Sequence, residues 1–147
     1  MADEPIVIEQ AFNVPVNTLW KAISDKQQMK KWYFDIPEFE PVAGFEFQFL
    51  GGDEVKKFLH LCKITEVIPG KKLAYTWRYD GYDGNSLVTF VLKDMGNTSR
   101  LTLTHEGLDT FPPVPELSKE NFRTGWKYII GTSLVQFVEQ PNGEEKK

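Results

Sequence analysis

The chain has 147 residues, a formal net charge of -4 and a single cysteine, which together exclude several classes of protein. An acidic chain offers no basic surface to gather phosphates, so nucleic acid is not an expected partner. One cysteine, Cys62, cannot form an internal disulfide or a multi-cysteine metal site, which favours a reducing, cytoplasmic setting. Neither a signal peptide nor a segment long enough to span a membrane is recognisable.

The first third of the chain predicts one strand and two short helices. Ile6, Ile8 and Phe12 share one parity and Glu9 has the other, as in a half-buried strand over residues 6–12. Apolar residues then recur at helical spacing over residues 16–23. Ser24 and Gln27 have the spacing of a capping box, which predicts that Ser24 opens a second short helix reaching Trp32.

The middle of the chain predicts a meander of five strands joined by short turns. Phe45, Phe47 and Phe49 alternate with polar residues and give the first of these strands a phenylalanine face. Residues 56–68 and 72–79 form a hairpin around Pro69 and Gly70, and aromatic residues dominate one face of its second arm. Two more strands, residues 87–95 and 100–106, complete an antiparallel sheet.

The last part of the chain predicts a loop, a long helix and a tail. Three prolines within residues 107–116 remove backbone donors and predict an irregular loop. From Ser118 onward, apolar residues including Phe122 and Trp126 keep to one side of a helix of about twenty residues. Residues 1–140 are expected to form one domain, and residues 141–147 a disordered tail.

The order of these elements indicates an α+β fold. A curved six-stranded antiparallel sheet must bury one face, and the long C-terminal helix is the natural element to fill its concave side. The two short helices after the first strand would cover the rest of that face. The 11 phenylalanines, 5 tyrosines and 4 tryptophans supply unusually bulky apolar surface for the enclosed space.

Five segments together carry a resemblance to a known family: LWKAISDKQQMKKWY, GFEFQFLG, ITEVIPGKKLAYTW, RLTLTHEGL, and the GW of FRTGWKYIIGTSL. The sequence resembles the START-like (helix-grip, SRPBCC) superfamily, in the branch of the C-terminal domain of the activator of the heat-shock-protein-90 ATPase. This resemblance implies a six-stranded sheet that grips the C-terminal helix. It also implies a cavity that relatives use for lipids, steroids, polyketides or other apolar molecules, without implying an enzyme.

The residues expected to line such a cavity are mostly aromatic and lie on the inward faces of strands and helices. The same faces could be ordinary core, but buried tyrosines need hydrogen-bond partners and make walls that orient a planar ligand. The candidates are Trp32, Phe45, Phe47, Phe49, His60, Tyr75, Trp77, Tyr79, Phe90, Leu103, His105, Phe122, Trp126, Ile129, Ile130 and Ser133.

The adjacent His105 and Glu106 have opposite parity on the last strand, so their side chains are expected on opposite faces of the sheet. The zinc pattern H-E-x-x-H is absent, because Asp109 stands where the second histidine belongs. His105 is therefore interpreted either as a structural residue packed near Trp126 or as a polar contact for a ligand.

His60 and Cys62 share parity on the third strand, but residues two apart on a strand are not preorganised as a nucleophilic pair. A buried, unreactive thiol is the expected state of Cys62. A bulge near Glu66 would change the register of this strand. The Asp-Gly turns around Asp80 and Asp83 lack calcium-loop spacing, so neither a metal nor a cofactor is expected.

Three functions are compatible with the sequence. The first is a non-catalytic binding protein for a small apolar or aromatic molecule. The second is a co-chaperone-like interaction module for a heat-shock ATPase, in stress response. The third is a cyclase or hydrolase, for which His105 and Glu66 are the candidate inward acid-base groups.

Overall fold

The computed structural model of the chain describes residues 5–33, 36–52, 57–112 and 117–139. Its strands form one antiparallel sheet in the order β1-β6-β5-β4-β3-β2. The strands are β1 (Ile6–Phe12), β2 (Glu46–Gly52), β3 (Lys57–Ile68), β4 (Lys72–Tyr79), β5 (Ser86–Asp94) and β6 (Ser99–Glu106). Helices α1 (Val16–Ser24) and α2 (Lys26–Trp32) follow β1. The predicted α+β fold with a six-stranded sheet is confirmed.

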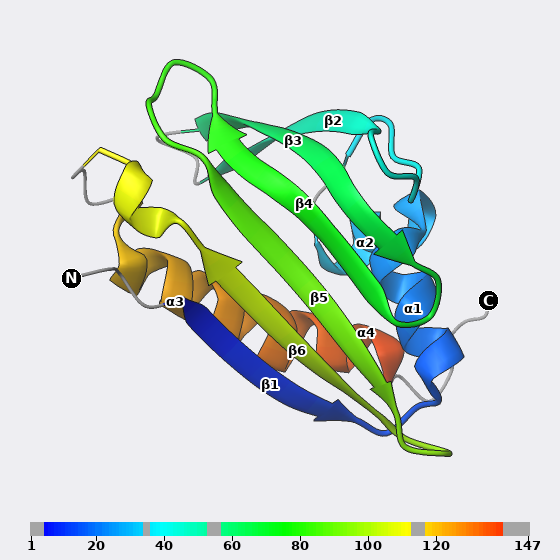
Figure 1. The fold of residues 1–147 in the computed structure, drawn as a ribbon. Helices are drawn as coiled ribbons and strands as arrows, with labels where there is room; N and C mark the ends of the chain where they lie inside the picture. Colours follow the sequence, from blue (N-terminus) through cyan, green and yellow to red (C-terminus); the bar gives the residue numbers. More distant parts are fainter. Residues whose placement is uncertain (1–4, 34–35, 53–56, 113–116, 140–147) are drawn as a thin grey trace.

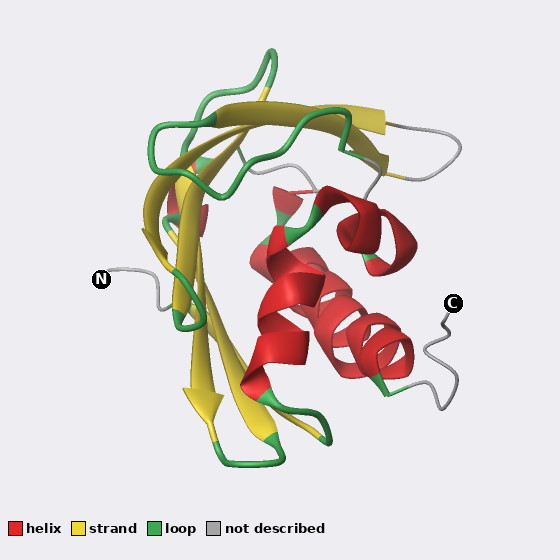
Figure 2. Cartoon of the chain, turned by 90° about the vertical axis from the view of Figure 1, so that its right-hand side faces the viewer, coloured by secondary structure: helices red, strands yellow, loops and turns green. Residues whose placement is uncertain are grey.

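The sheet is strongly curved, and α1, α2 and the long C-terminal helix lie on its concave side (Figure 2). The C-terminal helix runs across this side, behind β1, β6 and β5 in Figure 1. Alternation along β4 buries Leu73, Tyr75, Trp77 and Tyr79 together, as the sequence predicts. The inward faces of the sheet and the helices therefore enclose one common core.

A bulge is present in β3 and changes the position of Glu66. The register shifts between Ile64 and Glu66, so that Val67 lies opposite Leu73. The Glu66 carboxylate consequently faces solvent and pairs with the Lys72 ammonium group at 3.0 Å. The prediction of an inward acid-base role for Glu66 is wrong, because one extra residue reverses the side-chain alternation.

The break between α1 and α2 also differs from the prediction. Helix α1 extends through Ser24, whose hydroxyl donates to the Trp20 carbonyl at 2.6 Å. Asp25 is the N-cap of α2 instead, and its carboxylate accepts from the Gln28 N–H at 3.3 Å. A serine inside a helix often bonds back to the preceding turn, so the capping box expected at Ser24 does not form.

The C-terminal helix is continuous but not uniform. It comprises α3 (Lys119–Tyr128), a π-helical segment η3 (Ile129–Leu134) and α4 (Val135–Val138). Residues four apart drift around an α-helix of 3.6 residues per turn, and the wider π turns counteract this drift. The buried residues Phe122, Trp126, Ile130 and Leu134 accordingly stay on one face. The sequence predicts the buried face but not the π segment.

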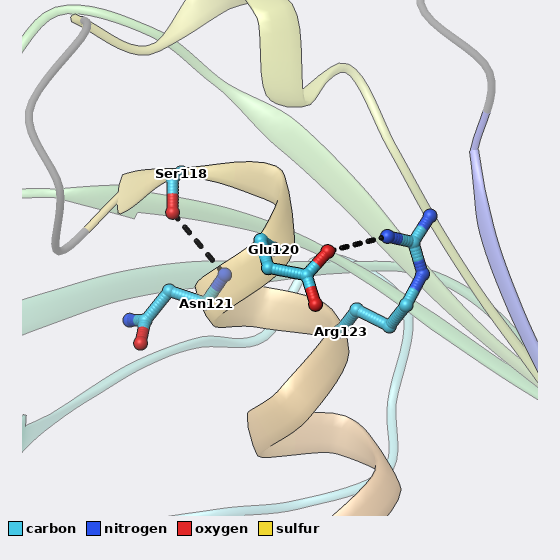
Figure 3. A network of polar contacts seen from close by, with 4 residues as sticks. All are labelled: Ser118, Glu120, Asn121 and Arg123. Carbon is cyan, nitrogen blue, oxygen red and sulfur yellow. Dashed lines mark hydrogen bonds and ion pairs between the residues drawn. The ribbon is translucent and has the colours of Figure 1, made fainter.

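The start of α3 is fixed by two polar contacts (Figure 3). The Ser118 hydroxyl accepts a hydrogen bond from the Asn121 N–H at 3.2 Å, as an N-cap does. Glu120 and Arg123 pair at 3.0 Å within the first turn and a half of the helix. These contacts set where the C-terminal helix leaves the segment that follows β6.

The segment after β6 contains a short helix where only loop was predicted. Leu108–Thr110 form the 3-10 helix η1, which begins after Gly107 at a φ of 85°. This turn precedes Pro112, so the prolines do not obstruct it. Residues 113–116 of the predicted loop lie outside the described residues. Across the described part of the chain, no helix is long and apolar enough to cross a membrane.

Candidate ligand-binding site

Aromatic rings fill the space between the sheet and the C-terminal helix. Trp77 of β4 lies near their centre, with ring centroids 4.9 Å from His60, 5.5 Å from His105 and 5.5 Å from Trp126. Rings from strands and helix are therefore in mutual contact. We refer to this group as the aromatic cluster. It consists of Tyr33, Phe49, His60, Trp77, Tyr79, His105, Phe122 and Trp126.

His105 has a hydrogen bond on each ring nitrogen. The Trp126 indole N–H donates to Nδ1 at 2.9 Å, so Nδ1 carries no proton. Nε2 lies 2.8 Å from the Ser86 hydroxyl, which itself donates to the Trp77 carbonyl at 2.8 Å. Nε2 is therefore the protonated nitrogen and donates to Ser86. Burial lowers the pKa of His105 to about 3, so the ring is neutral near pH 7.

This geometry matches the structural interpretation of His105, next to Trp126. Glu106 is exposed on the opposite face of the sheet, as its parity predicts. Ser86 was not among the predicted residues. The only sequence signal for it is its position at the start of β5, where a small residue can approach the His105 ring opposite Trp77.

His60 and Cys62 are both buried on β3. The His60 ring stacks on Phe49 with a centroid distance of 4.4 Å, and its Nδ1 lies 3.0 Å from the Phe58 carbonyl oxygen. Burial lowers the pKa of His60 to about 4 and raises the pKa of the Cys62 thiol. Both shifts favour the uncharged groups, in agreement with an unreactive thiol.

The inward-facing tyrosines find hydrogen-bond partners inside the core. The Tyr79 hydroxyl accepts from the Trp77 indole N–H at 2.8 Å. The Tyr75 hydroxyl lies 2.8 Å from that of Tyr33, and either can donate. Burial raises the pKa of all three phenols, so each stays protonated near neutral pH.

Tyr33 is a member of the aromatic cluster that the sequence analysis did not identify. It is the C-cap of α2, and its half-buried ring stacks on Trp32 at 5.0 Å and on Trp126 at 6.1 Å. Tyr33 lies four residues after the buried Met29, a spacing that would place both on the same face of a helix, and this was the available sequence signal. A residue just past the end of a short helix carries no reliable orientation, which is why the pattern missed it.

The structure brings most of the predicted lining residues into one buried group. Trp32 is also buried, but its indole N–H donates to the Ala22 carbonyl at 2.8 Å and joins α2 to α1. Phe45, Ile129 and Ser133 are half-buried at the periphery. The buried candidates are Phe47, Phe49, His60, Tyr75, Trp77, Tyr79, Phe90, Leu103, His105, Phe122, Trp126 and Ile130.

A separate concavity of about 750 Å³ lies against the outer face of β2, β3 and β4. Its outward-facing side chains alternate with the buried ones of the aromatic cluster, and many are charged or polar. This lining does not suit an apolar molecule. The lining residues are Pro37, Glu38, Glu46, Phe47, Gln48, Leu61, Cys62, Lys63, Thr76, Arg78 and Asn85.

Metal chemistry has no visible ligand set in the described ranges. Within them, no three or more histidine, cysteine, aspartate or glutamate residues are grouped so that they could hold a metal ion. The polar atoms of the interior are instead indole, imidazole and phenol groups, which suit hydrogen bonding to a small organic molecule.

Comparison with known proteins agrees with this geometry. Residues 13–139 match the family described as "Activator of Hsp90 ATPase homolog 1-like protein". The chain belongs to this family. Its sheet and C-terminal helix have the START-like, helix-grip arrangement. No curated protein matches the sequence significantly.

Several solved structures have the same fold as this chain over nearly its whole length. Protein MLL2253 from Mesorhizobium loti has a TM-score of 0.77 at 22% identity, covering 95% of this chain and 99% of that one. BH1534 from Bacillus halodurans has a TM-score of 0.73 at 26% identity, covering 95% and 100%. DynU16, from the dynemicin biosynthetic locus, has a TM-score of 0.77 at 19% identity and covers 94% of this chain. The chain spans only 48% of DynU16.

Proposed function

We propose that this family member is a non-catalytic binding protein for a small apolar or aromatic molecule, held between the sheet and the C-terminal helix. The observation that carries the proposal is the composition of the aromatic cluster. Its rings combine a large apolar surface with a few polar groups, including the Trp126 and Trp77 indoles and the Tyr33 hydroxyl. Apolar surface with a few oriented polar groups is the usual lining of a small-molecule site.

The state of the buried histidine supports binding rather than catalysis. Both nitrogens of His105 are engaged, by Trp126 and by Ser86. A general acid or base needs a proton or a lone pair directed at the substrate. The Glu66 carboxylate faces solvent, so the two groups considered for a cyclase or hydrolase do not converge.

The proposal predicts that N-phenyl-1-naphthylamine, a neutral fluorescent probe, binds the folded protein at one saturable site and quenches tryptophan emission. Quenching is expected because Trp77 and Trp126 are both in the aromatic cluster. Fluorescence titration measures the stoichiometry and the dissociation constant. Arg78→Ala, in the outer concavity, is the matched control and should bind the probe as the parent does. Absence of saturable binding by a protein that keeps its fold would refute the proposal.

A second candidate is a co-chaperone-like role on a heat-shock ATPase, and the family match favours it. Such a role would act through the surface and would not require the interior to open. ATP hydrolysis by purified heat-shock protein 90, with and without this chain, separates the two functions. Stimulation of hydrolysis would support the second, whereas a ligand-binding protein should leave the rate unchanged.

A further inference from the structure

We infer that the Tyr33 side chain occupies the place of a ligand ring, and that the buried Tyr75 hydroxyl selects planar aromatic ligands that carry a hydroxyl group. This inference rests on the proposed binding function and names the class of ligand. It concerns the end of the aromatic cluster nearest α2, where Tyr33 lies between Phe49 and Trp126.

The Tyr33 ring makes the contacts expected of a bound aromatic molecule. Its plane lies 24° from that of Trp126 and 26° from that of Trp32, a stacked arrangement on both. Tyr33 is half-buried, whereas Tyr75 is 0% exposed. Tyr33 is thus the outer member of the pair, and rotation of its side chain would vacate a ring-shaped space against aromatic walls.

The Tyr75 hydroxyl defines what can replace Tyr33. Among the residues that the structure describes, Tyr33 is its hydrogen-bond partner, at 2.8 Å. A purely apolar ring in that space would leave a fully buried hydroxyl unsatisfied, which is costly. A phenol would restore the same bond and make the same stacking contacts, so the site should discriminate by the hydroxyl.

The backbone that carries Tyr33 is held from the opposite side. Ser133, in the π segment of the C-terminal helix, donates its hydroxyl to the Trp32 carbonyl at 2.7 Å. The Trp32 indole N–H is in turn bonded to Ala22. These bonds fix the end of α2, so exchange of Tyr33 for a ligand needs only movement of its side chain. Both tyrosine pKa values are raised, which keeps the hydroxyls protonated and able to donate or accept.

The test compares phenol with benzene in variants of Tyr33. Tyr33→Ala removes one phenol ring, and phenol and benzene are titrated into this variant while the indole N–H signals are followed by NMR. Both ligands should bind to Tyr33→Ala, phenol more tightly than benzene. In the double variant Tyr33→Ala/Tyr75→Phe, the ratio of the dissociation constant of benzene to that of phenol should be about tenfold lower than in Tyr33→Ala. Tyr33→Ala should also tighten the binding of N-phenyl-1-naphthylamine, because the competing ring is gone.

Three results would overturn the inference. One is a folded Tyr33→Ala variant that binds neither ligand. Another is a benzene-to-phenol ratio that Tyr75→Phe leaves unchanged. The third is probe binding by the parent that Tyr33→Ala does not tighten. The third result would mean that the protein binds the probe at a site other than the one occupied by Tyr33, and the proposed function would stand. Absence of probe binding by both the parent and the Tyr33 variants would reject the proposed function. If Tyr33→Ala does not fold, Tyr33→Val keeps apolar contact near the backbone, leaves the outer part of the ring space open and serves in the same comparison.

Discussion

Replacing Trp126 by alanine is expected to lower the free energy of unfolding by about 3 to 5 kcal/mol. The indole is 3% exposed and touches rings from both the sheet and α2. Its removal leaves a large void and also leaves Nδ1 of His105 without its donor. Denaturant unfolding of parent and variant at pH 7 measures the loss. An unchanged dependence of the unfolding free energy on denaturant concentration shows that the two transitions are comparable.

Trp126→Phe separates packing from hydrogen bonding. It keeps most of the apolar area but removes the N–H, so a loss of about 1 to 3 kcal/mol is expected from the unsatisfied His105 nitrogen. In a His105→Phe background, Trp126→Phe should lower the free energy of unfolding by less. The double-mutant cycle then gives the coupling energy between Trp126 and His105. An unchanged melting temperature in Trp126→Ala would show that the residue is exposed and that the sheet does not grip the helix here.

Acidification is the second change with a large expected effect on stability. The pKa values of His105 and His60 are lowered to about 3 and about 4, from 6.5. Below pH 6.5 the unfolded chain binds protons that the folded chain does not, so stability should be complete above pH 6.5 and fall as the pH decreases toward 4. Each histidine contributes a slope of up to about 1.4 kcal/mol per pH unit.

The window from pH 6.5 to 5 isolates the histidines, because ordinary carboxyl groups titrate mainly below it. Unfolding free energies of the parent and of His105→Gln, measured at several pH values in this window, test the effect. The variant should have about half the slope of the parent, since His60 remains. A parent whose stability does not change in this window would contradict the burial of both rings.

The alternation of residues along the strands was sufficient to predict the faces of the sheet. Leu101, Leu103 and His105 share a parity and are all buried, and Glu106 is exposed. Where one extra residue enters β3, the same rule places Glu66 on the wrong face, because a bulge is a property of pairing between strands. Helical spacing likewise gave the buried face of the C-terminal helix but not its π segment.

The hydrogen-bond partners of the candidate site could not be predicted in the same way. The sequence predicted that His105 packs near Trp126 but not the hydrogen bond between them, and Tyr33 and Tyr75 lie 42 residues apart in the chain. Such pairs depend on how the sheet curves over the helices, which no local pattern records. The sequence predicted that buried tyrosines need partners, and the fold decides which groups provide them.

The most direct test of ligand binding in the aromatic cluster is an NMR titration of the four tryptophan indole signals with N-phenyl-1-naphthylamine. Trp77 and Trp126 are in the cluster, whereas Trp20 is half-buried on α1 and serves as the internal control. We expect saturable shifts of the Trp77 and Trp126 signals with little change at Trp20. Binding of the probe that leaves the Trp77 and Trp126 signals unmoved would contradict this expectation.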